Sequence, residues 1–493
     1  SQTLDQVREM APETSVKFAD IQGKLGDLIK RIESGKIGPT PPSPDLRDQA
    51  IQALLAPVQK LWDIVDEKLV VLRDQDGQAV RAGQKLIALN GKRAILLDTA
   101  SPKAPDEKDW SALVPLEVDP NRAFIVSGSN LVGSLSADGK SVLVAYRTAL
   151  RRFELSSGRL TLDKKLADFG APSPSQMSIT PRELVVVDSS GTIVCVDLTS
   201  GELRWKAASG AGRGALLPPE IACGCVLVRD RTFRQMLLLS LDKGRVLKKF
   251  EASRGLEGAL TREGFLVTMV DDELNVWEVG KLDKPLWWRR YGENSGASIL
   301  CVRDQNILVQ PSQEGEVKVL PMAGGGQSLA EFRLEAVGGE KPIAIDAMFD
   351  GQSIYVLSSS GIPGNVRRTN VNIRFMPCRN LALHRLSLDK DKPRWVYPLD
   401  VSGRYVTRPQ LPAVAQKHLV ATVREMQTQA TARAIVLDKE TGKAVQTIDL
   451  GGDSPKVNAA VRHRKLLQSG QAVITDGFLT VETGDGVAVY GTK

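Results

Sequence analysis

The stretch that decides the fold reads Leu184-Val-Val-Val-Asp-Ser-Ser-Gly191, Thr192-Ile-Val-Cys-Val-Asp197, Leu198-Thr-Ser-Gly201 and Glu202-Leu-Arg-Trp205. Its two aliphatic runs are separated by a Ser-Gly pair, which is typical of a hairpin turn. In the second turn, the Asp197 side chain can accept hydrogen bonds from amides further along the chain, and Gly201 can adopt a positive φ. Trp205 supplies a large ring where neighbouring sheets would meet. The stretch therefore predicts three consecutive antiparallel strands.

The same order of strands and turns recurs along most of the chain, at a period of about 40 residues that is typical of propeller blades. The first strands of these units begin near residues 142, 184, 226, 266, 307, 354 and 419. In a β-propeller each four-stranded sheet buries both faces against its neighbours. Amphipathic helical patterns do not occur in this region, which argues against a parallel α/β fold. We therefore predict an all-β propeller over residues 70–493.

Further strand patterns at the two ends of this region could close the ring. They are Leu86-Ile-Ala-Leu89 with Ile95-Leu-Leu97 at the front, and Val473-Ile-Thr475, Phe478-Leu-Thr-Val481 and Val487-Ala-Val489 at the end. Pooling these strands into one shared blade would remove the open sheet edges. Together with the seven interior units, the shared blade predicts eight blades. Seven blades are the alternative if one weak unit is only decoration.

Residues 1–69 show a different pattern, which predicts an N-terminal helical segment. Apolar side chains follow the 3-4 spacing of a coiled-coil-like helix at Phe18, Ile21, Leu25, Leu28 and Ile32. A proline-rich linker covers residues 36–44. A second helix is predicted from the N-cap Ser43 to Leu69. These helices could pack together, dock on the propeller or bind a partner helix.

Composition restricts the class of protein. The chain has 493 residues, with 42% hydrophobic and 25% charged residues, which is ordinary globular usage and excludes wholesale disorder. A net charge of +7 is too dilute over this length to indicate nucleic-acid binding. No stretch approaches the ~18 to 20 uninterrupted apolar residues of a membrane span. The start at Ser1-Gln2 fits a mature exported protein, and a tag remnant or proteolytic fragment is the alternative.

The cysteines and histidines show no spacing that indicates a metal site. Five cysteines leave at least one without a partner in the chain. Cys223-Gly-Cys225 could be a redox or metal pair, but the two side chains would share one face of a strand and no second pair completes a site. His384 lies inside a predicted strand and His418 precedes one, which favours structural roles.

At its turns the chain resembles the pyrroloquinoline-quinone-like (PQQ-like) propeller family, whose repeat is Asp-x-x-Thr/Ser-Gly followed by Trp. The best matches are Asp197-Leu-Thr-Ser-Gly201 with Trp205, and Asp438-Lys-Glu-Thr-Gly442. Weaker copies are Leu155-Ser-Ser-Gly158 and Asp242-Lys-Gly244. The resemblance implies either a quinoprotein dehydrogenase, with quinone and calcium in the central channel, or a cofactor-free scaffold such as the outer-membrane assembly lipoprotein.

The family's dehydrogenase site is not recognisable in this sequence. That site has an adjacent Cys-Cys pair, which does not occur here because Gly224 separates Cys223 from Cys225. It also has a Trp platform, calcium ligands and an Asp base, and no spaced loop of this chain supplies the converging oxygen ligands that calcium requires. The resemblance is therefore to the scaffold members, and no enzyme activity and no cofactor are expected.

The largest departure from the repeat is an insertion between Ser358 and Leu381. It gathers arginines with one aromatic residue, at Arg367, Arg368, Arg374, Phe375 and Arg379. These residue types anchor protein interfaces, so the insertion predicts a docking loop for an acidic partner or a lipid headgroup. A long solvated hairpin is the alternative. Arg462, Arg464 and Lys465 form a second, weaker basic patch.

We predict a non-catalytic, exported β-propeller that acts as a protein-interaction scaffold or structural subunit of a larger bacterial envelope or membrane-associated complex. Its partners would be other protein subunits, and a membrane surface is a further candidate. Nucleic acid, metal and small-molecule ligands are not expected. The alternative is a quinone- or metal-dependent enzyme, or a small-molecule binder, that uses the central channel. A carbohydrate-binding module would need exposed aromatic platforms, which an aromatic content of 5% disfavours.

Overall fold

The computed structural model describes residues 57–65, 69–75, 79–83, 85–90, 93–99, 111–115, 131–146, 148–210, 217–230, 234–253, 255–291, 300–302, 307–311, 315–324, 326–339, 341–360, 375–376, 379–388, 393–399, 405–407, 412–426, 430–452, 472–475, 477–483 and 486–491. The chain divides into two compact units, residues 1–45 and 46–493, and every described residue belongs to the second. The helix predicted around Phe18 to Ile32 and the linker 36–44 lie outside the described residues.

The described residues form nine antiparallel sheets. The first contains β2 (Leu69–Val71), β3 (Arg81–Ala82), β4 (Lys85–Asn90), β5 (Arg93–Asp98) and β6 (Ser111–Pro115). The second contains β7 (Leu131–Leu135), β8 (Ser141–Tyr146), β9 (Ala149–Glu154) and β10 (Leu160–Lys165), followed by the 3-10 helix η2 (Leu166–Phe169). The third contains β11 (Pro174–Ile179), β12 (Glu183–Asp188), β13 (Thr192–Asp197) and β14 (Glu202–Ala208). The fourth contains β15 (Glu220–Ala222), β16 (Cys225–Arg229), β17 (Gln235–Ser240) and β18 (Val246–Glu251).

The remaining sheets continue in chain order. The fifth contains β19 (Leu256–Leu260), β20 (Phe265–Val270), β21 (Glu273–Glu278) and β22 (Trp287–Arg290). The sixth contains β23 (Leu300–Val302), β24 (Ile307–Pro311), β25 (Glu316–Pro321) and β26 (Ala330–Arg333). The seventh contains β27 (Ile343–Phe349), β28 (Ile354–Ser360), β30 (Arg379–Leu386) and β31 (Trp395–Pro398). The eighth contains β29 (Phe375–Met376), β32 (Tyr405–Thr407), β33 (Ala413–Val414), β34 (His418–Met426), β35 (Ala430–Asp438) and β36 (Ala444–Gly452); the ninth contains β1 (Gln59–Val65), β37 (Ala472–Thr475), β38 (Phe478–Thr483) and β39 (Gly486–Gly491).

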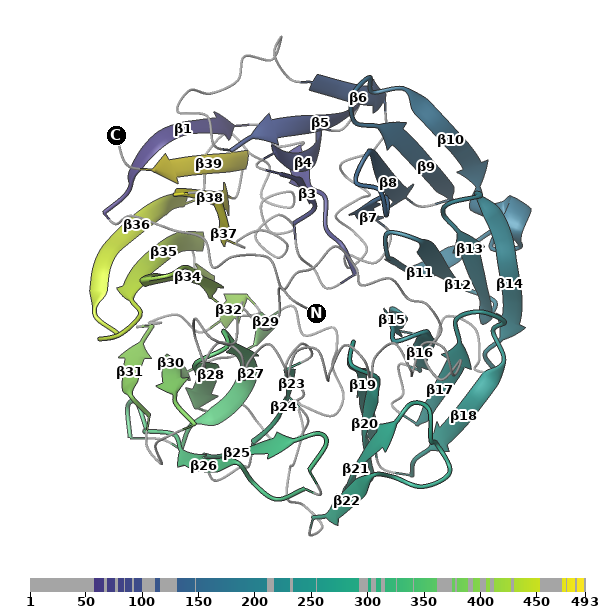
Figure 1. The fold of residues 1–493 in the computed structure, drawn as a ribbon. Helices are drawn as coiled ribbons and strands as arrows, with labels where there is room; N and C mark the ends of the chain where they lie inside the picture. Colours follow the sequence, from purple (N-terminus) through teal and green to yellow (C-terminus); the bar gives the residue numbers. More distant parts are fainter. Residues whose placement is uncertain are drawn as a thin grey trace, which may run out of the picture. The chain divides into compact units, whose positions relative to one another are not determined.

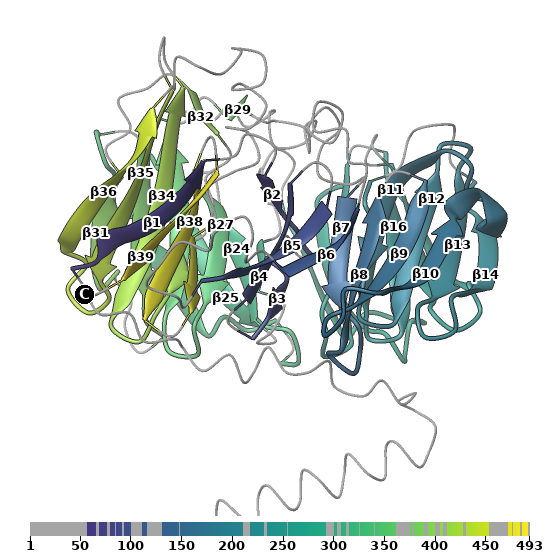
Figure 2. The same ribbon diagram turned by 90° about the horizontal axis from the view of Figure 1, so that it is seen from above.

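These sheets form a closed ring, which confirms the predicted all-β propeller (Figure 1). Nine buried apolar clusters each join two successive sheets, because the strands carry apolar side chains on both faces. The cluster that closes the ring joins Leu69 and Leu86 of the first sheet to Val487 of the ninth. Strands β10, β14 and β18 lie at the outer side of the ring, and β7, β11 and β15 at its inner side (Figures 1 and 2).

The closing sheet is built from both ends of the propeller, as predicted, but from a different N-terminal strand. β1 pairs with β39, whereas the hairpin 86–97 lies in β4 and β5 of the first sheet. The seven interior units and the shared closing blade are thus all present, and the hairpin contributes a further sheet. Assigning this hairpin to the shared blade was wrong, and so is the seven-bladed alternative.

The helix predicted from Ser43 to Leu69 is wrong over its second half. Residues 59–65 form β1, and Leu69 begins β2, so the first propeller strand begins at Gln59 rather than at the predicted boundary, residue 70. The pairing of β1 with β39 shifts register between Lys60 and Trp62. A bulge inserts one extra residue and interrupts the two-residue alternation of a strand. The apolar residues Leu61, Trp62 and Val65 therefore have a spacing that resembles a helix.

A tryptophan on the outer strand locks each of three sheets onto the next one. The indole Nε1 of Trp205 donates to the carbonyl oxygen of Leu241 at 2.7 Å, across to the fourth sheet. Trp287 and Trp395 repeat this bond with the oxygens of Met322 at 2.8 Å and Lys439 at 3.0 Å. Each ring also covers a glycine of positive φ in the same turn: Gly244, Gly326 and Gly442. The tryptophan of one sheet and the glycine-containing turn of the next sheet therefore hold neighbouring blades together.

Candidate functional site

The predicted partner-binding residues are only partly described. Phe18, Ile21, Leu25, Leu28 and Ile32, together with Arg367, Arg368 and Arg374, lie outside the described residues. The backbone of Phe375 lies in β29 of the eighth sheet, and that of Arg379 lies in β30 of the seventh. The insertion thus begins in β28 and ends in β30 of the seventh sheet, and its β29 pairs in the eighth sheet. Its role as a docking loop stays a prediction.

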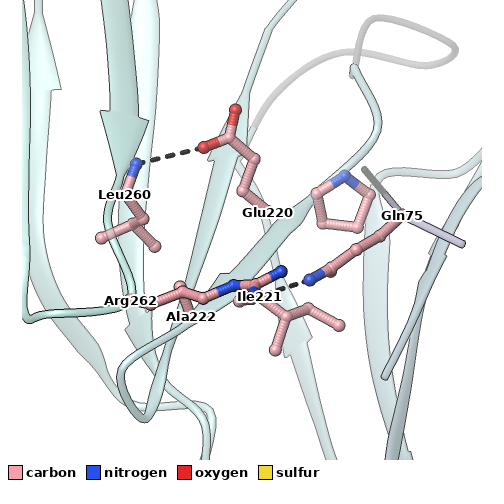
Figure 3. Close-up of a pocket in the computed structure, with 7 residues that line it drawn as sticks. Gln75, Glu220, Ile221, Ala222, Leu260 and Arg262 are labelled. Atoms are coloured by element: carbon pink, nitrogen blue, oxygen red, sulfur yellow. Dashed lines mark hydrogen bonds between the residues drawn. The ribbon is translucent and has the colours of Figure 1, made fainter. Parts of the chain in front are cut away.

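A pocket lies where the inner strands of the fourth and fifth sheets meet the segment that follows β2 (Figure 3). The space in it that a water-sized group can occupy is about 20 Å³, within about 320 Å³ of open space that includes solvent. The residues that line it combine apolar walls with three polar side chains: Gln75, Pro219, Glu220, Ile221, Ala222, Leu260 and Arg262. Sequence reasoning missed this pocket, because its polar residues stand singly in three separate stretches of the chain.

Gln75 reaches the pocket from the first sheet because the second sheet anchors its segment. The amide of Gly133 donates to the carbonyl oxygen of Arg73 at 2.8 Å, and Leu72 is fully buried above Gly133. A Cβ at Gly133 would lie 2.3 Å from Leu72 Cδ2, so this close approach requires glycine. Gln75 Nε2 then donates to the carbonyl oxygen of Ile221 at 3.1 Å.

Glu220 joins the two sheets that form the wall of the pocket. Its Oε1 accepts a hydrogen bond from Arg229 Nη2 at 2.5 Å, and its Oε2 accepts one from the amide of Leu260 at 3.1 Å. Arg229 Nη1 also donates to the carbonyl oxygen of Gly258 at 2.8 Å. Because both carboxylate oxygens are engaged and the charge is paired, Glu220 holds the wall in place rather than acting as a general base.

Two other polar groups belong to the lining of the pocket. Gln75 Oε1 is buried and accepts no hydrogen bond within the described residues. Arg262 is exposed and extends along the pocket toward Gln75 (Figure 3). The lining therefore combines a guanidinium with an amide oxygen that accepts no hydrogen bond from the described residues.

A serine and a histidine lie together in the seventh sheet, away from this pocket. His384 Nε2 and Ser358 Oγ are 2.7 Å apart, and both side chains are fully buried. Burial lowers the pKa of His384 to about 4, so the ring is neutral at neutral pH. His384 Nδ1 has no hydrogen-bond partner among the described residues, so no carboxylate orients the ring as in a catalytic triad. This geometry agrees with a structural role for His384.

The neutral His384 makes the stability of the propeller depend on pH. Its folded-state pKa of about 4 lies below the ordinary value of about 6.5, so the unfolded chain takes up a proton first as the pH falls. The associated stability is complete above about pH 6.5 and is lost toward pH 4. Between pH 7.5 and pH 5 the loss should be about 2 kcal/mol. The His384→Gln variant should lack this component in urea unfolding experiments.

His418→Gln is the matched control, because His418 is only half-buried at the start of β34. It leaves the buried pair of Ser358 and His384 intact, so the slope that His384 produces should remain. An unfolding free energy of His384→Gln that changes with pH as much as that of the unmodified protein would contradict the assignment.

The described thiols are free, at Cys195, Cys223 and Cys225. Burial raises the pKa of Cys195 to about 12, which makes this thiol unreactive. Cys223 sits at the tip of the hairpin between β15 and β16, with φ 44°, and its hydrogen bond to the Cys225 side chain lowers the pKa of Cys225.

Within the described residues, no group of three or more His, Cys, Asp or Glu side chains is placed to hold a metal ion. No helix in this part of the chain is long and apolar enough to cross a membrane.

Comparison with known proteins finds fold similarity alone. No protein-family model matches the sequence, and no curated protein does. Among solved structures, BamB from Moraxella catarrhalis is 13% identical with a TM-score of 0.40, covering 72% of this chain and 92% of BamB. Hsv2 from Kluyveromyces lactis is 10% identical with a TM-score of 0.41, covering 66% and 99%. The computationally designed Ika8 protein is 12% identical with a TM-score of 0.41, covering 75% and 98%. Similarities this distant carry no argument about activity or partners, and the PQQ-like repeat stays a prediction.

Proposed function

We propose that this chain is a non-catalytic propeller that serves as a protein-interaction scaffold within a larger assembly. The proposal rests on exposed aliphatic side chains that recur at one position of the repeat. They are Leu160, Leu203, Val246, Leu286, Leu329 and Val445, and their exposure lies between 37% and 51%. We call this set the outer apolar belt.

Each residue of the belt lies in the first two residues of an outer strand or directly before it, after the turn from the third strand of its sheet. In four sheets a register shift occurs at this point, for example between Leu160 and Leu162 of β10. A bulge adds one residue to a strand and so changes the direction in which the side chains beside it point. Because the turn and the bulge repeat, the first side chains of these outer strands are redirected in the same way in each of the four sheets. Scattered exposed aliphatic residues are common on proteins, but these six recur at the same place in six different sheets. Trp288 on β22 adds an aromatic side chain that is 60% exposed, a residue type enriched in interfaces.

An envelope location and membership of a bacterial complex belong to the same proposal. They are supported by the resemblance of the turns at Asp197–Gly201 and Asp438–Gly442 to cofactor-free PQQ-like scaffolds. The rival is an enzyme or small-molecule binder of the central channel. A protein purified from its source with a quinone absorbance and bound calcium would favour that rival.

The assembly mass of the protein in gently prepared native extract tests the scaffold. We expect a mass well above 53.5 kDa. Introducing Leu203→Lys, Val246→Lys and Leu286→Lys together should shift the protein to its monomer mass with an unchanged melting temperature, because three charges in a desolvated contact oppose association. Thr161→Lys, Thr199→Lys and Gln327→Lys is the matched control, since it adds the same charge at exposed polar positions near the starts of outer strands. A monomeric native protein, or an assembly that survives the belt substitutions, would refute the proposal.

A further inference from the structure

The hairpin between β15 and β16 carries two thiols at its tip. Ala222, the last residue of β15, pairs with Cys225, the first residue of β16, so Cys223 and Gly224 alone form the turn. Both turn residues have a positive φ, 44° and 75°, as a tight two-residue hairpin turn requires. The expectation that both cysteines lie on one face of a single strand is therefore wrong, because the chain reverses between them.

The turn brings the two cysteine side chains into contact. Cys223 and Cys225 are both free thiols, and their side chains are hydrogen-bonded to each other. A disulfide needs Cα atoms about 4.4 to 6.8 Å apart. Residues two positions apart reach about 7 Å only in a fully extended chain, and a turn shortens this separation. A disulfide here therefore needs the two sulfur atoms to approach further, while the pairing of β15 with β16 stays as it is.

The two thiols differ in exposure. Cys225 is 3% exposed and packs in the apolar cluster between the fourth and fifth sheets, whereas Cys223 is half-buried. The space beside the turn is open, since a Cβ built at Gly224 has no atom of the described residues within 4 Å other than its chain neighbours. The turn is also held in place, because the carbonyl oxygen of Gly224 accepts a hydrogen bond from the amide of Leu241 at 2.8 Å. A small reagent therefore reaches Cys223 first, and Cys225 lies behind it.

The contact also changes the acidity of the two thiols. The hydrogen bond that Cys223 donates lowers the pKa of Cys225, and the same bond together with burial raises the pKa of Cys223. The two sulfur atoms thus share a proton, and a thiolate forms on the pair more easily than on a single buried thiol. Cys195 shows the contrast, because burial raises the pKa of that thiol to about 12.

We propose that Cys223 and Cys225 form a reversible disulfide by exchange with a small disulfide such as oxidised glutathione. The proton of Cys223 passes to the Cys225 thiolate, and the Cys223 sulfur attacks one sulfur of glutathione disulfide, so that the first glutathione leaves and takes up a proton. Cys225 then loses its proton and attacks the Cys223 sulfur, which releases the second glutathione as a thiol. The protein gives up two hydrogen atoms and the glutathione disulfide takes them up, so the exchange needs no other oxidant.

This disulfide is a reversible modification rather than a structural cross-link. The stability that a disulfide adds grows with the length of the loop that it closes, and this loop spans only three residues, 223–225. Strained or exposed disulfides are also reduced more easily than buried structural ones. The site depends on the two thiols alone, so it can be present or absent whether or not the protein is a scaffold.

Mass spectrometry of the full chain after equilibration in glutathione tests the site. The folded protein is incubated with oxidised and reduced glutathione, the remaining thiols are trapped with N-ethylmaleimide in urea, and the chain is digested with trypsin. Residues 214–229 are released as one peptide whose cysteines are Cys223 and Cys225. Residues 183–204 are released as one peptide whose single cysteine is Cys195, and this peptide is the internal control.

We expect the peptide 214–229 to become lighter by two hydrogen atoms, about 2 Da, and to regain both thiols in dithiothreitol. The oxidised fraction of the Cys195 peptide should be about tenfold lower, because that thiol is buried and its pKa is raised. Folded protein that stays reduced in a buffer in which the urea-unfolded chain forms the disulfide would overturn the proposal. So would equal oxidation of the Cys195 peptide, or a mixed disulfide with glutathione that never closes.

Two variants test the roles of the individual thiols. Cys225→Ser keeps the accessible thiol and removes the one that resolves the mixed disulfide, so one glutathione should accumulate on Cys223. Cys223→Ser keeps only the buried thiol, so the peptide 214–229 should stay reduced. Equal trapping of glutathione by the two variants, each with an unchanged melting temperature, would overturn the proposed exchange. If either variant does not fold, the measurement on the unmodified protein decides by itself.

Discussion

Replacing Lys439 with Ala should lower the free energy of unfolding by about 4 kcal/mol, because it leaves a buried carboxylate without its counter-charge. Lys439 Nζ lies 2.6 Å from Asp350 Oδ2, and the two side chains are only 5% and 2% exposed. The pair joins the turn after β27 in the seventh sheet to the turn after β35 in the eighth. Burial alone would raise the pKa of Asp350, but hydrogen bonds from Lys439 and from the amides of Ser353 and Gln352 outweigh it and lower the pKa.

The cost of the Lys439→Ala substitution should shrink as the pH is lowered. Without the ammonium group, burial disfavours the charged form of Asp350, so the folded variant takes up a proton more readily than the unmodified protein. Urea unfolding at pH 7 and at lower pH measures both effects. A penalty that does not change with pH would show that lost side-chain packing, and not the carboxylate, causes the destabilisation.

Lys318→Ala is the matched control for this prediction. Lys318 Nζ lies 3.1 Å from Glu331 Oε1, but these side chains are 33% and 58% exposed. A solvated pair of this kind contributes about 0 to 1 kcal/mol. If Lys318→Ala and Lys439→Ala cost the same, burial of the Asp350 pair is not what stabilises the contact between the seventh and eighth sheets.

Gly244→Ala should cost about 3 kcal/mol, since it combines backbone strain with a steric clash. Gly244 has φ +65°, and a Cβ there would lie 2.4 Å from Cε3 of Trp205. The ring cannot move away without stretching its 2.7 Å hydrogen bond to the carbonyl oxygen of Leu241. The substitution therefore forces the third and fourth sheets apart, and thermal or urea unfolding should detect the loss.

Gly139→Ala separates the two contributions to this cost. Gly139 has φ +69°, but no atom lies within 4 Å of a Cβ built there. This variant should therefore lose only the strain of the left-handed conformation, about 1 kcal/mol. Equal losses in the two glycine variants would show that the contact with Trp205 contributes little to the packing of the sheets.

The sequence predicted the features of the fold that depend on neighbouring residues. Asp197 Oδ1 accepts hydrogen bonds from the amides of Thr199 and Ser200, and Gly201 has φ +73°, as the turn pattern indicated. Trp205 lies between the third and fourth sheets, as its place in the repeat indicated. The candidate pocket was not predictable, because nothing near Gln75, Glu220 or Arg262 in the sequence relates them to one another.

The amino-acid sequence by itself determined the strand–turn period, the residues that make each turn and the apolar faces that pack sheet on sheet. These properties are local, because a hairpin is set by residues only a few positions apart. Only the tertiary structure decided which strand closes the ring, since β1 near residue 60 finds its partner β39 near residue 490. It also decided the pocket, where Gln75 meets Ile221 across 146 residues of chain. Such contacts depend on the curvature accumulated over all the intervening sheets, a sum that no single stretch of sequence contains.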